Sequence, residues 1–124
     1  MNSLGKQIIA ELYCCDRKRL DDVDFIRQAM LSAARAAGTR IVTETFHRFS
    51  PQGVSGAVII TDSHLAIHTW PEHGYAAVDL FTCSEAVHSE KAIDYLRDAL
   101  QSQQSTVEEM RRGDGLARNP SIPC

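Results

Sequence analysis

The sequence predicts an α+β domain, a two-layer α/β sandwich in which two helices cover one face of a mostly antiparallel sheet. Two segments carry apolar residues at helical spacing, and between and around them lie short runs rich in β-branched and aromatic residues. The implied order of elements is β-α-β-β-β-β-α-β, with strands that follow one another through tight turns. Helices packed on one side of an antiparallel sheet are the arrangement that this order favours.

The N-terminal part is expected to contain one strand and one helix. The strand is predicted over Gly5–Tyr13, which includes a short apolar run. Acidic residues within 21–24 are typical of a helix start, and Gly38 is typical of a helix end. Between them, the residues expected to face the core are Phe25, Ile26, Ala29, Met30 and Ala33.

Four strands in succession, a second helix and a last strand are predicted in the rest of the chain. The strands are expected at residues 40–49, 54–61, 64–70 and 75–83, where strong β-formers gather. The second helix is expected within 84–102, and its inward residues would be Ala92, Ile93, Leu96 and Leu100. Residues 105–112 are expected to form the last strand. By length the chain forms one domain, predicted to cover residues 1–112, and residues 113–124 are interpreted as a C-terminal tail.

Composition and charge argue against several classes of protein. A net charge of -3 with a pI near 5.9 provides no polycationic surface, so no nucleic-acid partner is expected. No window approaches the ~18–20 apolar residues of a membrane span, and the first apolar run is too short for a signal peptide. We therefore expect a cytoplasmic protein without a membrane partner. The sequence has no CxxC pair and no Cys/His spacing of the zinc type, so no metal is expected. In a reducing compartment the four cysteines are expected to be free thiols: Cys14, Cys15, Cys83 and Cys124.

The stretch TDSHLAIHTWP, residues 61–71, places many polar groups in and beside a predicted strand. His64 and His68 would share one strand face because side chains alternate, so they are either structural or half of a metal site without evident further ligands. Ser63, His68 and Asp79 are the candidates for a hydrolase triad, although no Gly-x-Ser-x-Gly elbow is present and GVSG at 53–56 has the wrong spacing.

A third possibility is that Ser63 attacks its own backbone. The serine hydroxyl would add to the preceding carbonyl, the peptide would become an ester, and elimination would leave a pyruvoyl group. This route requires a tight, strained turn, which the junction at Asp62 and Ser63 could supply. Ser55 and His68 could flank that junction from adjacent strands.

Two segments carry a resemblance to a known family. Residues 45–83, TFHRFSPQGVSGAVIITDSHLAIHTWPEHGYAAVDLFTC, closely resemble the short bacterial and archaeal S-adenosylmethionine decarboxylase proenzymes, above all in HLAIHTWPE and DLFTC. Residues 4–16, LGKQIIAELYCCD, are similar to the first strand and turn of that family. The match covers most of the chain from residue 4 to about residue 100.

The resemblance implies roles for residues around the serine. Cleavage between Asp62 and Ser63 would give a β chain of residues 1–62 and an α chain whose first residue is a pyruvoyl group made from Ser63. His68 would remove the Cα proton of Ser63 during elimination, and Ser55 would support the intermediate. Cys83 would return a proton to the substrate carbon in decarboxylation, since a thiol is mostly protonated at neutral pH. In the family the residue before the serine is commonly Glu, whereas this chain has Asp62.

The resemblance also implies a substrate and an assembly. The substrate amine would form a Schiff base with the pyruvoyl ketone, which then accepts the electrons released with CO₂. Phe49, Trp70 and Glu72 match positions expected to hold the adenosyl group, which favours S-adenosylmethionine and a role in spermidine biosynthesis. Arginine or ornithine is the alternative substrate, and an inactive member acting as a binding partner is a further one. A homodimer with active sites at the interface, (αβ)₂ after processing, is expected.

Overall fold

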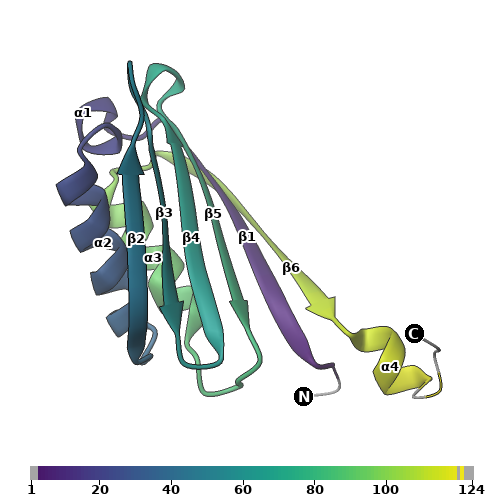
Figure 1. Ribbon diagram of the computed structural model, residues 1–124. Helices are drawn as coiled ribbons and strands as arrows, with labels where there is room; N and C mark the ends of the chain where they lie inside the picture. Colours follow the sequence, from purple (N-terminus) through teal and green to yellow (C-terminus); the bar gives the residue numbers. More distant parts are fainter. Residues whose placement is uncertain (1–2, 120, 122–124) are drawn as a thin grey trace.

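The computed structural model describes residues 3–119 and residue 121, and its main feature is a six-stranded antiparallel sheet (Figure 1). The order across the sheet is β2-β3-β4-β5-β1-β6, so β2 and β6 are its edges. The predicted α+β sandwich is confirmed. In chain order the strands are β1 (Gly5–Tyr13), β2 (Ile41–Arg48), β3 (Val54–Ile60), β4 (Ser63–Trp70), β5 (Tyr75–Thr82) and β6 (Gln104–Arg112).

Two long helices, α2 (Val23–Ala36) and α3 (Ser89–Ala99), lie against one face of the sheet (Figure 1). The side chain of Asp22 caps α2 by accepting a hydrogen bond from the Phe25 N–H at 3.0 Å, as the acidic start predicted. Most of the predicted inward residues are buried, and Phe25 is partly buried against the core. Three short helices complete the chain: α1 (Arg17–Leu20), η1 (Pro71–His73) and α4 (Asp114–Arg118).

The two faces of the sheet differ in what covers them. We call the face against α2 and α3 the helix face and the other the open face. Alternation along β4 places the buried Leu65 and Ile67 on the helix face, and His64, His68 and Trp70 on the open face. The open face therefore carries both histidines and the tryptophan of the stretch that the sequence singled out, whereas Ser63 does not lie on it.

The structure corrects one boundary and adds two helices. Helix α3 begins at Ser89 and not near residue 84, because the Ser84 N–H and carbonyl both bond the Thr82 hydroxyl and the His88 N–H donates to the Ala37 carbonyl. The short helices α1 and α4 were not predicted. Part of the expected tail, including Cys124, lies outside the described residues.

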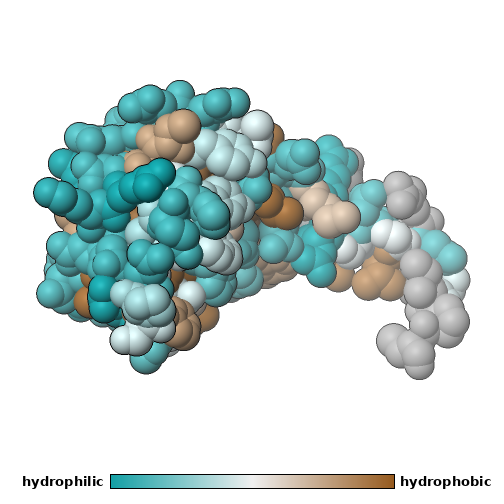
Figure 2. All heavy atoms as spheres, turned by 90° about the horizontal axis from the view of Figure 1, so that it is seen from above, coloured by the Kyte–Doolittle hydropathy of each residue, from teal (hydrophilic) through white to brown (hydrophobic). Residues whose placement is uncertain are grey.

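Seen from above, the molecule has a wide body and a narrower extension (Figure 2). The ends of β1 and β6 together with α4 form this extension (Figure 1). No helix within residues 3–119 is both long enough and apolar enough to cross a membrane.

Candidate active site

The turn between β3 and β4 holds the proposed scissile peptide. Asp62 has a φ of 61°, in the left-handed region, which costs an L-residue roughly 1–2 kcal/mol. Its carbonyl oxygen accepts a hydrogen bond of 3.0 Å from the backbone N–H of Cys83. The carbonyl that Ser63 would attack is therefore part of a strained turn and is already polarised by a donor.

The hydroxyl of Ser63 is held by Thr82, a residue that the sequence analysis did not select. Ser63 Oγ lies 2.8 Å from Thr82 Oγ1, and Thr82 is fully buried. The sequence contained a signal: Ala76, Val78 and Leu80 occupy the inward positions of β5, and Thr82 is the polar residue that ends this series.

Cys83 follows β5 directly and its side chain is exposed. Because its N–H contacts the Asp62 carbonyl, the cysteine lies beside the proposed cleavage point. We call the group of Asp62, Ser63, Thr82 and Cys83 the turn end of the site.

A second group of predicted residues gathers at the other end of β4. Ser55 and His68 are direct cross-strand partners, and Ser55 Oγ lies 2.7 Å from His68 Nδ1. Both residues line a cavity of about 270 Å³. This cavity also contains every residue predicted to hold the adenosyl group. We call the group of Phe49, Ser55, His68, Trp70 and Glu72 the pocket end.

Trp70 in the pocket end is supported by two tyrosines on the open face. Its ring stacks on Tyr75 with centroids 5.3 Å apart, and Tyr75 stacks on Tyr13 at 5.5 Å. The Tyr75 hydroxyl donates to Glu11 at 2.6 Å. The pKa of Tyr75 is raised, mainly by burial and to a smaller extent by this hydrogen bond. The aromatic row fixes one wall of the pocket.

Asp21 anchors the loop at residues 49–53, of which Phe49, Gln52 and Gly53 line the same cavity. Its carboxylate accepts hydrogen bonds from the Gly53 N–H at 2.9 Å and from Arg48 at 2.8 Å, which lower the pKa of Asp21. Gly53 has a φ of 104°, and a Cβ there would lie 3.1 Å from the Thr69 carbonyl, so the position favours glycine. The Phe49 N–H closes the loop on the Gly53 carbonyl at 2.8 Å.

Within one chain the two ends are far apart. Ser63 and His68 are five positions apart on β4, roughly 16 Å at ~3.3 Å per residue, and alternation places them on opposite faces. Asp79 pairs with His64 at 3.4 Å and not with His68, so the hydrolase alternative of Ser63, His68 and Asp79 is not assembled in one chain. Among the residues that the structure describes, no three His, Cys, Asp or Glu side chains are grouped as a metal site would need.

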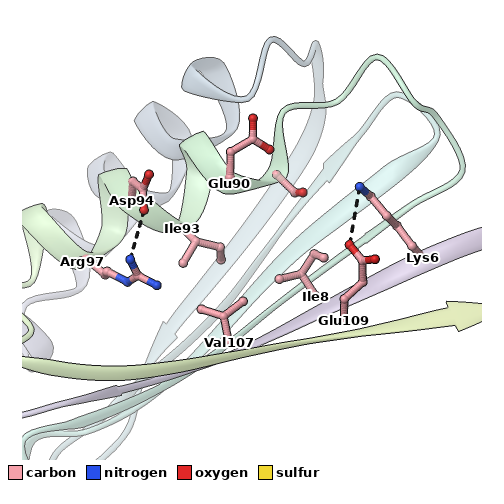
Figure 3. Close-up of a pocket in the computed structure, with 9 residues that line it drawn as sticks. Lys6, Ile8, Glu90, Ile93, Asp94, Arg97, Val107 and Glu109 are labelled. Atoms are coloured by element: carbon pink, nitrogen blue, oxygen red, sulfur yellow. Dashed lines mark hydrogen bonds and ion pairs between the residues drawn. The ribbon is translucent and has the colours of Figure 1, made fainter.

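A separate cavity of about 300 Å³ lies between α3 and the strands β1 and β6 (Figure 3). Ile8 and Val107 from the strands and Ile93 from α3 face its interior, and Lys6 pairs with Glu109 at 3.7 Å. None of the residues lining this cavity belongs to the turn end or the pocket end. The predicted site residues therefore do not use the cavity.

Comparison with known proteins agrees with the fold and the motifs. The family model described as S-adenosylmethionine decarboxylase matches residues 6–113. The S-adenosylmethionine decarboxylase proenzyme of Acidithiobacillus ferrooxidans (strain ATCC 53993 / BNL-5-31) is 59% identical over 113 residues, covering 91% of this chain and 85% of the relative. The proenzyme of Thermotoga maritima is 56% identical over 91% of this chain and 87% of its own.

Solved structures give the same result. The crystal structure of the adenosylmethionine decarboxylase from Aquifex aeolicus superposes with a TM-score of 0.83 at 34% identity, covering 90% of this chain and 92% of that one. A Trypanosoma brucei AdoMetDC monomer, at 20% identity and a TM-score of 0.62, shares the fold. The chain is thus a two-layer α+β protein of the self-processing decarboxylase class. It belongs to the S-adenosylmethionine decarboxylase family, in its short prokaryotic type.

Proposed function

We propose that this chain cleaves itself between Asp62 and Ser63 and then decarboxylates S-adenosylmethionine, producing an aminopropyl donor for spermidine biosynthesis. Proenzymes of the family form a pyruvoyl group from their own chain. The observation that carries the proposal is the Asp62–Ser63 peptide, with Asp62 at a φ of 61° and its carbonyl bonded to the Cys83 N–H at 3.0 Å.

The geometry of the turn supports each step of self-cleavage. Ser63 Oγ adds to the Asp62 carbonyl carbon, the C–N bond breaks, and the hydroxyl proton ends on the Ser63 nitrogen, so an ester replaces the peptide. The Cys83 N–H already donates to this carbonyl oxygen at 3.0 Å, which supports a role in stabilising the negative charge that develops there. Removal of the Ser63 Cα proton then breaks the Cβ–Oγ bond and releases Asp62 with a new C-terminal carboxylate. The enamine that remains rearranges to an imine, and hydrolysis of this imine releases ammonia and leaves the pyruvoyl ketone.

We propose that a second copy of the chain supplies His68 and Ser55 to this turn. The separation of the two ends within one chain supports this, since His68 must reach the Ser63 Cα proton. The pocket end, at about 270 Å³, is also below the ~300–1,000 Å³ of a complete ligand site. A two-fold contact through the open face would bring each turn end to the other copy's pocket end. Exposed apolar side chains on that face, Ile9 and Ile59, favour such a contact.

The substrate follows from the chemistry of the pocket end. Trp70 and Phe49 can stack on an adenine and attract a sulfonium cation, and Glu72 can accept hydrogen bonds from ribose hydroxyls. The pyruvoyl ketone supplies the electron sink for decarboxylation. The exposed Cys83 thiol at the turn end is placed to return a proton to the substrate carbon.

Intact-mass measurement of the purified protein tests self-cleavage. We expect two fragments split between Asp62 and Ser63, with a C-terminal fragment that reacts with hydrazines because its first residue carries a ketone. A chain that stays at full length after long incubation would contradict the proposal and favour an inactive family member.

Release of CO₂ from labelled substrates tests specificity. We expect S-adenosylmethionine to be turned over faster than arginine or ornithine at equal concentration. Preference for either amino acid would overturn the substrate while leaving the self-cleavage chemistry in place.

A further inference from the structure

Thr82 is a buried polar residue that contacts the proposed nucleophile, Ser63. It is fully buried at the end of β5, and its hydroxyl has three hydrogen-bonding partners. It donates to the Ser84 carbonyl at 3.2 Å, and it accepts from the Ser84 N–H at 3.0 Å and from Ser63 at 2.8 Å. Because a hydroxyl has one proton, and here that proton points to a carbonyl, the Ser63 hydroxyl must be the donor in the pair.

The two reacting groups of the scissile peptide are held by consecutive residues. Thr82 binds the Ser63 hydroxyl, which is the nucleophile, and the N–H of Cys83 binds the Asp62 carbonyl, which is attacked. Both contacts come from the end of β5, whose register with β4 pairs Ser63 directly with Thr82. One rigid strand end therefore fixes both partners of the attack, as an intramolecular reaction requires.

We propose that Thr82 is a catalytic residue of self-cleavage. Its hydroxyl accepts a hydrogen bond from the Ser63 hydroxyl and so holds the Ser63 oxygen in one position until the attack begins. This inference rests on the proposed role of Ser63 as the nucleophile. Thr82 gains and loses no proton overall, since the hydroxyl proton of Ser63 ends on the Ser63 nitrogen when the C–N bond breaks. Thr82 thus acts in ester formation, before the step in which the Cα proton is removed.

A purely structural role for Thr82 predicts a different result. The Ser84 bonds alone would make Thr82 a cap on the loop after β5, and its loss would then lower stability without changing the chemistry of Ser63. The two roles are separated by measuring where along the reaction a variant stops.

The experiment compares Thr82→Val and Thr82→Ser with the wild-type full-length chain, made by cell-free synthesis and followed by mass over time. Valine keeps the volume and loses the hydroxyl, whereas serine keeps the hydroxyl and loses the methyl group. We expect Thr82→Val to cleave at least about tenfold more slowly, because it loses the one hydrogen bond that orients the Ser63 hydroxyl for attack, and Thr82→Ser to cleave at close to the wild-type rate.

Hydroxylamine locates the blocked step, because it cleaves esters much faster than peptides. We expect it to release no extra fragment from Thr82→Val, since the ester forms slowly and does not accumulate. Extra release would place the block after the ester and overturn the inference. Urea unfolding of uncleaved chains, each carrying Ser63→Ala to prevent processing, checks folding. If Thr82→Val is not folded, the cleavage rate of the folded Thr82→Ser variant tests the inference instead. Slow cleavage by Thr82→Ser, which keeps the hydroxyl, would contradict the inference.

The outcomes also separate this inference from the proposed function. If the wild-type chain does not cleave, the proposed role of Ser63 fails. If the wild type cleaves and Thr82→Val cleaves equally fast, only the role of Thr82 fails.

Discussion

The turn end and the pocket end are built by different means. At the turn end, two of the three positioning features belong to the backbone: the left-handed conformation of Asp62 and the main-chain N–H that binds its carbonyl. The third is the buried hydroxyl of Thr82. At the pocket end, exposed side chains such as His68 and Trp70 are positioned by stacking and by a hydrogen bond between side chains.

This difference indicates how each end responds to change. A group fixed by the backbone survives most substitutions of its side chain, whereas a group fixed by side chains depends on each of them. In the proposed function the turn end contributes the scissile peptide and Cys83, and the pocket end contributes the substrate-binding side chains together with His68 and Ser55. Substitutions at the two ends can therefore be used to test which end acts in cleavage and which in turnover.

The largest effect is expected from mixing two variants that are each inactive. Ser63→Ala lacks the nucleophile and His68→Ala lacks the proposed base, so neither should cleave alone. In a mixed dimer, the intact pocket end of the Ser63→Ala copy should serve the turn end of the His68→Ala copy, and cleavage should appear.

Mass measurement of the co-expressed chains, with one carrying an affinity tag, identifies which copy is cut. We expect cleavage of the His68→Ala chain only. Cleavage of His68→Ala by itself, or none in the mixture, would contradict the assignment of the two ends to different copies.

Replacing Cys83 with alanine should separate processing from turnover. The N–H that binds the Asp62 carbonyl belongs to the backbone and remains in the variant, so cleavage should continue. Loss of the proton donor should lower kcat by about 10²-fold or more. Cys14→Ala, at the opposite end of the sheet and also exposed, is the matched control and should change neither rate. Blocked cleavage of Cys83→Ala would instead mean that Cys83 acts in processing, the role assigned to His68.

The sequence was sufficient for the sheet because its strands are strongly apolar and end at turns. It failed at residues 84–88, where the Thr82 hydroxyl and the Ala37 carbonyl hold a loop in place of a helical start. Local pattern does not contain such contacts, since Ala37 is far away along the chain.

For the site, the motifs identified residues but not their arrangement. The gathering of the pocket end depends on the pairing of Ser55 with His68, which follows from the β3–β4 register. Asp21 carried no signal, because its partner Gly53 is 32 positions away and the bond exists only in the folded chain. Thr82 did carry one, a polar residue at an inward position, and this could have been recognised.

A moderate effect is expected from Glu72→Gln. The variant keeps the shape of the side chain and loses the charge that would bind ribose hydroxyls, so KM for S-adenosylmethionine should rise roughly tenfold with little change in kcat. Self-cleavage should proceed normally, because Glu72 has no proposed role in it. Glu90→Gln, in the cavity of Figure 3, is the matched control and should leave KM unchanged. If Glu90→Gln raises KM and Glu72→Gln does not, the substrate uses the other cavity.

The smallest effect is expected from Asp21→Asn, which weakens the anchor of the loop containing Phe49. The amide can still accept from the Gly53 N–H but loses its charge toward Arg48, so KM should rise roughly two- to fivefold, as for an exposed ion pair. Asp24→Asn, an exposed carboxylate in the first turn of α2, is the control and should leave KM unchanged.

The pH dependence of stability gives an independent measurement of the same anchor. Bonds from the Gly53 N–H and Arg48 lower the pKa of Asp21 in the folded chain, so its contribution to folding is present above the ordinary Asp pKa of ~3.9 and is lost as pH falls through the folded pKa. The difference in unfolding free energy between the wild type and Asp21→Asn, measured by urea titration, should therefore be constant near neutral pH and shrink below about pH 4. A difference that grows on acidification would mean that protonated Asp21 is the form that holds the loop, and that the pocket end is not anchored by charge.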